Sequence, residues 1–302
     1  MSSRIRAPGP INTRRLWLPN YGTGADGSPA SSSFTVTDGA HGATYNWVAY
    51  TLDAAHTITL AAAHAPSIFR ASSSITINGT INGDGLGQAA GAGSGPGGNA
   101  VDNGSNYGAG GGGAGHGTSG TAGTTALTDV GGAAGARYDS LARFQAAFLA
   151  ATFASTHQGS GGGTGSTGLN GAGGAGGAGG GGLWLIAPTI IIGDSANIHV
   201  LGAAGAAGTG ADPGSGGGGG GSGGLLVLVA KNLILEGSGA GYELTATGGA
   251  GGSGGGGAGG GGAGAVGSIY LVQLGSISSG AAARCNPTAT VFSVGVLPVV
   301  LT

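Results

Sequence analysis

The chain has 302 residues, of which 77 are glycine, and only 7% are charged. Glycine does not recur at every third position and only 10 prolines accompany it, which excludes a collagen triple helix. The formal net charge of −2 excludes the strong positive field typical of proteins that bind nucleic acid or anionic membranes. A hydrophobic content of 40% argues against a disordered chain, because disorder goes with low hydrophobicity and high net charge.

Residues 1 to about 65 predict a small β-rich attachment region. Three strand-like runs with turns between them lie at Phe34–Thr37, Tyr45–Leu52 and Thr57–Leu60. A basic arm precedes them, and it either docks on a partner or is a solvated tail. The candidate particle-attachment residues of this arm are Arg4, Arg6, Arg14, Arg15 and Trp17.

The body of the chain, which we place at residues 66–280, repeats itself. A copy that reads GLWLIAPTIIIGDSANIHVLG begins at Gly182, and GLLVLVAKNLILEGSG begins forty-two residues later at Gly224. A shorter copy begins at Gly267 as GSIYLVQLGSISSG, and an earlier one begins at Pro66. Repetition with this period is the signature of stacked repeat architectures.

Each repeat predicts an apolar strand, a break, a second strand, a polar turn and a third short strand before a glycine tract. The break falls at Pro188 in one copy and at Lys231-Asn232 in the next. Continuous apolar runs suit strands that are covered on both faces. The repeats therefore predict an all-β fold, a β-solenoid in which stacked short strands bury one another.

Glycine tracts join the predicted strands. In Gly171–Gly182 the non-glycine residues are alanines at every third position, Ala172, Ala175 and Ala178. A polyproline II-type helix has three residues per turn, so these alanines would form one ridge and bare backbone the other two. Bare ridges would let neighbouring tracts approach closely enough for backbone hydrogen bonds. We expect polyglycine II-like tracts packed side by side, and a flexible linker is the alternative.

The segment Arg137–Ser155 predicts an inserted α-helix, over about residues 139–155 and within residues 126–158. Its apolar positions recur at helical spacing, at Leu141, Phe144, Phe148 and Ala151. Asp139 or Ser140 can cap its start. The helix either covers an open apolar flank or presents a binding surface. After the body, residues 281–302 predict a β-rich tail that closes the stack or joins a partner chain, and they contain the single cysteine, Cys285.

The sequence predicts no enzyme, cofactor or metal site. Ser222 and Ser253 match G-x-S-x-G, but each lies in a glycine tract and lacks the strand and helix that expose a nucleophilic serine. The only glutamates, Glu236 and Glu243, lie around one turn and are expected to be solvated. The histidines show neither an i, i+4 pair nor the cysteine spacing of a zinc site.

Recognition by loops is therefore the predicted chemistry. Isolated aromatic or imidazole side chains interrupt the glycine-rich turns at Tyr107, His116, Tyr138 and Tyr242. An aromatic ring covers the apolar face of a sugar while nearby amides bind its hydroxyls. These four residues are the candidate receptor-binding residues, and local packing is the alternative.

The tracts GAGGAGGAGGGG and GGAGGSGGGGAGGGGAG, which alternate with short aliphatic strands, resemble the glycine-rich adhesins at the tail-fibre tips of T-even-type phages. The resemblance is one of composition and covers roughly residues 66–280. It implies a sandwich of polyglycine II helices, with variable loops that bind the host surface.

We accordingly predict a non-enzymatic receptor-binding adhesin on a fibre or spike of a phage or phage-like particle. It would dock on other virion proteins through its N-terminal region and bind host cell-surface polysaccharide. The expected location is the virion, after synthesis in the host cytoplasm and release by lysis. No stretch of eighteen apolar residues occurs, so no membrane span is expected, nor is a nucleic-acid partner, and a homo-oligomer is left open. The alternatives are a purely structural virion component, such as a fibre, cap or decoration protein, and a secreted bacterial glycine-rich surface or ice-binding protein.

Overall fold

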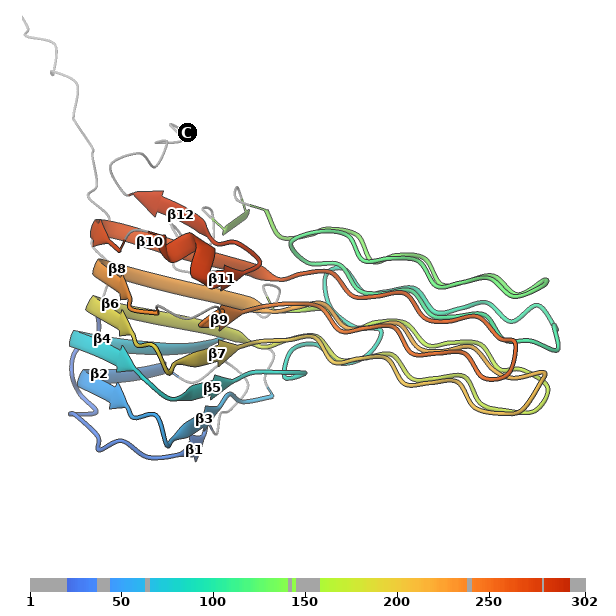
Figure 1. Cartoon of the computed structure of the whole chain (residues 1–302), viewed down its shortest axis with the longest axis horizontal. Helices are drawn as coiled ribbons and strands as arrows, with labels where there is room; N and C mark the ends of the chain where they lie inside the picture. Colours follow the sequence, from blue (N-terminus) through green and yellow to red (C-terminus); the bar gives the residue numbers. More distant parts are fainter. Residues whose placement is uncertain are drawn as a thin grey trace, which may run out of the picture.

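The computed structural model describes residues 21–36, 44–62, 66–140, 143–144, 158–237, 241–278 and 280–293. Within these residues the chain alternates between two parallel sheets of six strands each, from which glycine-rich loops project in one direction (Figure 1). The long-strand sheet contains β2 (Thr44–Leu52), β4 (Ser67–Ile77), β6 (Gly182–Ile192), β8 (Leu225–Leu235), β10 (Ser268–Ile277) and β12 (Thr290–Ser293). The short-strand sheet contains β1 (Phe34–Thr35), β3 (Thr57–Thr59), β5 (Thr80–Asn82), β7 (Asn197–His199), β9 (Leu244–Thr245) and β11 (Cys285–Asn286), the last preceded by the 3-10 helix η2 (Ala281–Arg284).

Successive repeats stack in register in the long-strand sheet. Leu183 of β6 pairs with Leu226 of β8, and Leu226 pairs with Ile269 of β10. Both steps are 43 residues (226 − 183 and 269 − 226), so the spacing of forty-two that the sequence predicted for the first step is one residue short. The difference matters because a shift of one residue exchanges the inward and outward faces of a strand.

The break predicted inside each repeat is not a break between two strands. β6 and β8 each run continuously for 11 residues, and their pairing continues on both sides of Pro188 and Lys231. Ala187 and Ile190, on either side of Pro188, are fully buried. The apolar inner face therefore holds the strand together across a residue that cannot donate a ladder hydrogen bond.

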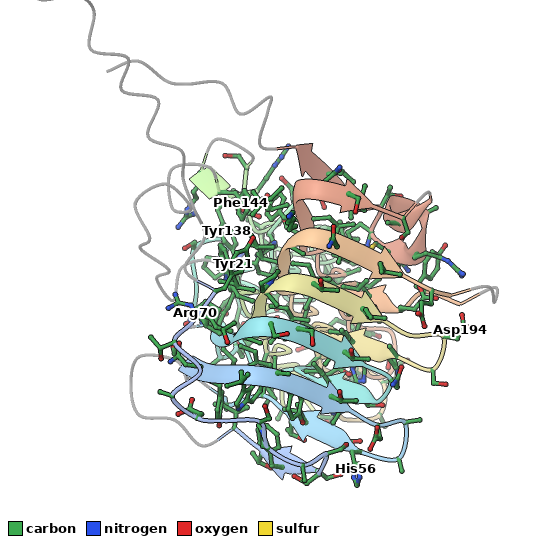
Figure 2. The ribbon with its side chains drawn as sticks, turned by 90° about the vertical axis from the view of Figure 1, so that its left-hand side faces the viewer. Tyr21, His56, Arg70, Tyr138, Phe144 and Asp194 are labelled. Carbon is green, nitrogen blue, oxygen red and sulfur yellow. The ribbon has the colours of Figure 1, made fainter. Side chains whose placement is uncertain are left out.

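The main core lies between the two sheets, where aliphatic side chains from both sheets form one cluster. A second cluster lies on the outer face of the long-strand sheet, around Trp184, Val227 and Tyr270. Phe144 and Tyr21 pack on this second cluster, and they lie on the same side of the sheet in Figure 2. Both faces of the long-strand sheet are thus covered along the continuous apolar first halves of β6, β8 and β10, whereas the outer face of the second half of β8 is more open, with Ile234 38% exposed.

Only the first turn of the predicted helix falls within the described residues. The Phe144 N–H donates to the Ser140 carbonyl at 2.9 Å, and the Arg143 N–H donates to Ser140 Oγ at 3.2 Å. Ser140 is therefore the capping residue. The Phe144 ring stacks on Tyr270 with ring centroids 4.0 Å apart, so this position covers the sheet. The other predicted helix positions lie outside the described residues.

The predicted boundaries near residues 65 and 281 do not interrupt the sheets. β1, β2 and β3 pair with the strands of the body, and β11 and β12 pair with β9 and β10. Residues 26–31 run along the outer edge of β2, where they accept hydrogen bonds from its outward N–H groups through Asp26, Gly27 and Ser28. This edge is thereby closed to further strand pairing.

Between β5 and β6, β7 and β8, and β9 and β10 the chain leaves the sheets in extended runs and returns (Figure 1). These runs have backbone hydrogen bonds to one another but belong to no sheet. The runs are residues 95–100, 108–117, 120–124, 131–136, 159–166, 171–181, 200–209, 214–224, 246–255 and 259–267.

The run 214–224 lies in the interior of this bundle. Its N–H groups point in turn to three neighbouring runs, and each third residue bonds to the same neighbour: Gly217, Gly220 and Gly223 to run 259–267, Gly218, Gly221 and Gly224 to run 200–209, and Gly216, Gly219 and Ser222 to run 159–166. Three further runs, 108–117, 171–181 and 246–255, donate to its carbonyl groups. Run 108–117 is surrounded in the same way, and we call these two the interior runs.

The interior position explains why run 214–224 consists of glycine and serine only. A Cβ atom at Gly219 would lie 1.9 Å from the carbonyl oxygen of Gly112, and one at Gly218 would lie 2.0 Å from that of Ala175. In contrast, Ala172, Ala175 and Ala207 of the outer runs are exposed. Glycine is therefore required at those interior positions where a Cβ atom would meet a neighbouring backbone, and the few other interior residues are mostly small, such as the buried Ala109 and Ala114.

Candidate functional site

The turns at the far end of the glycine bundle form the candidate site. We call them the distal loops, and they lie at the end of the runs away from both sheets (Figure 1). Neighbouring loops bond to one another; the Val101 and Val130 backbones exchange hydrogen bonds, and the Leu169 N–H donates to the Asn106 carbonyl. The distal loops are residues 101–107, 125–130, 167–170, 210–213 and 255–258.

A buried carboxylate holds two of these loops and the neighbouring run 159–166 together. Asp129 is 1% exposed, and its Oδ1 accepts hydrogen bonds from the N–H groups of Asn103 at 2.9 Å and Ser105 at 3.2 Å. Its Oδ2 accepts a hydrogen bond from Ser166 Oγ at 2.9 Å. Because all of these partners lie on other segments, the Asp129 carboxylate fixes the shape of the loops rather than a ligand.

The distal loops expose large aliphatic side chains. Leu127 is 78% exposed and Leu169 is 67% exposed, and Val101 and Val130 are about half exposed. Leu127 is also the only non-glycine residue with positive φ (49°) among the described residues. Leu127 is unfavourable in two ways, because its backbone is strained and its apolar side chain is exposed to water. Strained residues of this kind concentrate at functional sites. The exposed aliphatic surface is typical of a binding face.

A shallow depression of about 480 Å³ opens between the distal loops. Its lining comprises Tyr107, Thr124–Leu127, Asp212 and Gly257–Gly260. A Cβ atom at Gly257 would lie 2.7 Å from the Tyr107 ring and 3.5 Å from Asp212 Oδ1, so glycine is needed for the ring to rest there. A hydrogen bond to the Asp212 carboxylate raises the pKa of Tyr107.

The charges of the distal loops are all negative. They contain Asp102, Asp129 and Asp212 but no lysine or arginine. Hydrogen bonds from the Gly104 N–H and from Thr167 Oγ1 lower the pKa of Asp102. The surface that the loops present is therefore apolar and acidic.

The structure does not bring the four predicted recognition residues together. Tyr107 lines the distal depression. Tyr242, which is 52% exposed, lies in the turn between β8 and β9, at the opposite end of the sheets from the glycine bundle. His116 and Tyr138 lie where the runs meet the sheets, next to Ser268 at the start of β10.

His116 and Tyr138 belong to a polar cluster in which His116 is buried and Tyr138 is half-buried. His116 is fully buried, its ring packs edge-on against Tyr138 at 4.9 Å, and its Nδ1 lies 3.4 Å from Ser268 Oγ. Burial raises the pKa of Tyr138, whose hydroxyl donates to the Gln158 carbonyl. A receptor cannot reach the buried His116 ring, so His116 contributes packing.

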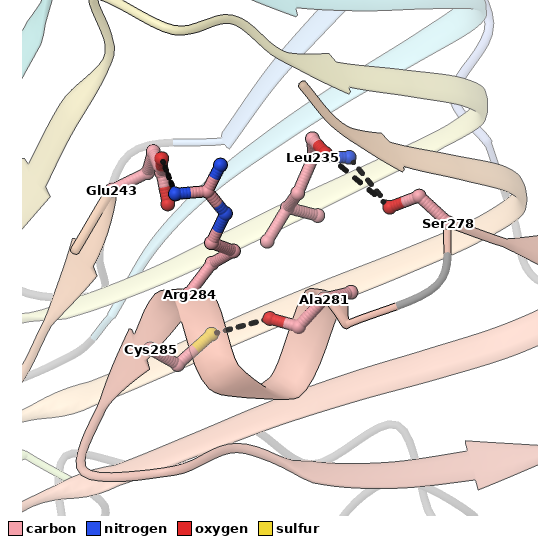
Figure 3. A network of polar contacts seen from close by, with 6 residues as sticks. All are labelled: Leu235, Glu243, Ser278, Ala281, Arg284 and Cys285. Atoms are coloured by element: carbon pink, nitrogen blue, oxygen red, sulfur yellow. Dashed lines mark hydrogen bonds and ion pairs between the residues drawn. The ribbon is translucent and has the colours of Figure 1, made fainter. Parts of the chain in front are cut away.

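Cys285 also has a packing role. Its thiol is buried and donates to the Ala281 carbonyl at 3.4 Å, beside the ion pair between Arg284 and Glu243 at 3.4 Å (Figure 3). Burial, with a smaller effect of the Glu243 charge, raises the pKa of the thiol to about 12. The expectation that Glu243 is solvated is wrong, since its side chain is 6% exposed.

The predicted particle-attachment residues, Arg4, Arg6, Arg14, Arg15 and Trp17, lie outside the described residues. Three residues of the distal loops were missed from the sequence: Leu127, Asp129 and Asp212. A signal for them exists, because the short turns that interrupt the glycine tracts are where larger side chains gather, as in TALTDV and GADP.

Among the described residues, no three histidine, cysteine or acidic side chains come close enough to hold a metal ion. No helix in the same residues is long and apolar enough to cross a membrane. Comparisons with protein-family models, with curated proteins and with solved structures find no match for this chain.

Proposed function

We propose that the chain is a non-enzymatic adhesin on a fibre or spike of a phage or phage-like particle, which binds host surface glycan through its distal loops. The observation that carries this proposal is the gathering of exposed aliphatic side chains, above all Leu127, at the far end of a bundle whose interior is mostly glycine backbone. A bundle of this kind serves to hold loops at a distance from the sheets.

The hydrogen bonding of the runs supports a polyglycine II-type bundle mounted on a β-solenoid base. Each third residue of run 214–224 bonds to the same neighbouring run, which fits a helix of three residues per turn. Strands that alternate between two parallel sheets, with repeats 43 residues apart, fit a solenoid. Such a framework is stiff, because the interior N–H groups are bonded in every direction.

The distal loops support recognition better than a purely structural role. A fibre shaft or decoration protein has no need of a leucine held at positive φ and 78% exposed. Loops that a rigid scaffold positions are the common location of binding residues. The exposed aliphatic side chains of a recognition surface would be covered when the host receptor binds.

Two measurements test the proposal. Antibody against the chain, followed by gold labelling and electron microscopy of particles from a lysate, should label the tips of fibres or spikes. Label on cell walls, with none on particles, would instead favour the secreted surface protein. Purified chain should also bind cells of the strain that the particles infect, as measured by flow cytometry with a fluorescent label.

The role of the distal loops is tested by a matched pair of substitutions. Leu127→Asp should reduce cell binding at least about tenfold, because it places a charge at the most exposed aliphatic side chain of the distal loops. Ile234→Asp changes an exposed aliphatic residue of β8, 38% exposed, and should leave binding unchanged. Equal binding by both variants would remove the distal loops from recognition and favour a structural component.

A further inference from the structure

The depression between the distal loops has the dimensions of a small-ligand site. Its volume of about 480 Å³ falls in the range of about 300 to 1,000 Å³ that is usual for such sites. It is open to solvent on one side, so it can receive the end or a branch of a longer molecule. Four segments of the chain contribute to it, which means that its shape depends on the packing of the bundle.

Tyr107 is held in place at this depression by contacts on several sides. Its N–H donates to Ser105 Oγ at 3.1 Å, and its ring rests on Gly257, where a Cβ atom would lie 2.7 Å from Cε1. Its phenol bonds to the Asp212 carboxylate. A ring fixed before the ligand arrives loses little entropy on binding, which favours its use as a platform for the apolar face of a sugar.

The polar groups around Tyr107 select among sugars. The carboxylate of Asp212 and the hydroxyls of Thr124 and Thr125 can accept hydrogen bonds from sugar hydroxyl or amino groups. The lining contains no lysine or arginine, and neither do the distal loops. A uronic or sialic acid would therefore bring its carboxylate towards Asp212 without a cation to balance the charge, and like charges in contact discriminate strongly against a ligand.

We propose that this depression binds one residue of a neutral or amine-bearing sugar, with the Tyr107 ring as the platform and the Asp212 carboxylate as the acceptor that excludes acidic sugars. The inference rests on the proposed function, because it names the part of the host glycan that the distal loops contact. It extends that function by assigning a chemical class of ligand and a selectivity to two residues.

The test is binding of three defined probes to the full chain, by isothermal titration and saturation-transfer NMR. The probes are tri-N-acetylglucosamine, the glucosamine trimer and trigalacturonic acid. We expect the first two to bind and trigalacturonic acid to bind at least about tenfold more weakly. Tyr107→Ala should weaken the binding of both favoured probes about tenfold or more, whereas Tyr107→Phe keeps the ring and should lose only a small factor.

Two further variants separate the parts of the inference. Asp212→Asn should reduce the preference for the glucosamine trimer over its N-acetylated form, and it should raise the affinity for trigalacturonic acid. Tyr242→Ala is the matched control, since Tyr242 is 52% exposed at the other end of the sheets, and it should change nothing. Folding of every variant is checked by its melting temperature.

The failure of this inference is distinguishable from failure of the proposed function. If trigalacturonic acid binds as well as the other probes, or if Tyr107→Ala binds every probe and attaches to cells as the wild type does, the sugar site is overturned. Cell attachment that persists without binding of any probe, and without an effect of Tyr107→Ala, also overturns it and leaves the adhesin intact. If the wild type attaches to no cells while the probes bind as expected, the proposed function fails and the sugar site stands.

Discussion

Replacing Gly219 by alanine should destabilise the protein far more than its small size suggests. Gly219 lies in the interior run 214–224, and a Cβ atom there would lie 1.9 Å from the carbonyl oxygen of Gly112 and 2.4 Å from its carbon. Ordinary contact begins near 3.4 Å, so the two interior runs must separate by about 1.5 Å (3.4 − 1.9). Neither atom belongs to a flexible side chain that could turn aside.

The free-energy cost follows from the hydrogen bonds that this separation breaks. The Gly111 N–H donates to the Gly217 carbonyl at 2.9 Å, and the Ala114 N–H donates to the Gly220 carbonyl at 3.0 Å, one on each side of the clash. Leaving a buried backbone group without a partner costs about 1 to 3 kcal/mol. Two such bonds give about 2 to 6 kcal/mol. Alanine recovers at most about 1 kcal/mol of this, because it makes the unfolded chain stiffer.

Differential scanning calorimetry of the purified chain measures this effect. At about 2 °C per kcal/mol for a chain of this size, the net loss of about 1 to 5 kcal/mol should lower the Tm of Gly219→Ala by about 2 to 10 °C. Gly260→Ala is the matched control, because its Cβ atom would meet nothing closer than the Gly252 oxygen at 3.7 Å. The control should keep or slightly raise Tm. Equal Tm values for the two variants, with unchanged circular dichroism, would refute the idea that a Cβ atom at Gly219 forces the two interior runs apart.

Three further predictions concern single buried groups. Asp129→Ala should leave the N–H groups of Asn103 and Ser105 without their acceptor, so residues 101–107 should exchange their amide hydrogens faster, as measured by mass spectrometry. Unchanged protection of these residues would contradict the prediction. Phe144→Ala should lower the free energy of unfolding by about 3 to 5 kcal/mol, and Tm should fall. It should also expose Trp184, whose ring centroid lies 5.9 Å from that of Phe144, so that tryptophan emission shifts to the red. The raised pKa of Cys285 gives a stabilisation that is complete below its ordinary value of 9.0 and is lost as the pH rises towards about 12. Cys285→Ala should therefore have a smaller fall in Tm over that range than the wild type, and parallel curves would count against this assignment.

The repeats could be predicted from the sequence because each copy carries its own apolar strand. The exact register and the continuity of the strands could not, since both depend on neighbours. Pro188 marks a break when β6 is read alone, yet the buried side chains of Ala187 and Ile190 keep the strand in the sheet on both sides of it. The spacing between the first two copies was also one residue short. The glycine at the start of each copy has no side chain by which the copies could be aligned.

The candidate site could be predicted only in part for a related reason. Tyr107 and His116 look alike in sequence, since each is a ring among glycines, but they lie at opposite ends of run 108–117. Residue type does not say which end of a run reaches the sheets and which reaches the distal loops. Leu127 was missed because an exposed leucine at positive φ contradicts both hydrophobicity and backbone preference, the two rules by which loops are read from sequence.

The bundle separates the residues that must be kept from those that can change. At an interior position such as Gly218 or Gly219 any side chain meets a carbonyl group of another run, so glycine is required whatever the protein binds. In the distal loops this requirement is confined to glycines such as Gly168 and Gly257, and the loops already differ in length from four residues, 210–213, to seven, 101–107. The strands set the position of each run along the bundle, because run 214–224 leads directly into β8 and run 259–267 leads directly into β10. Substitutions in the loops can therefore alter what is recognised while the framework that presents them stays the same.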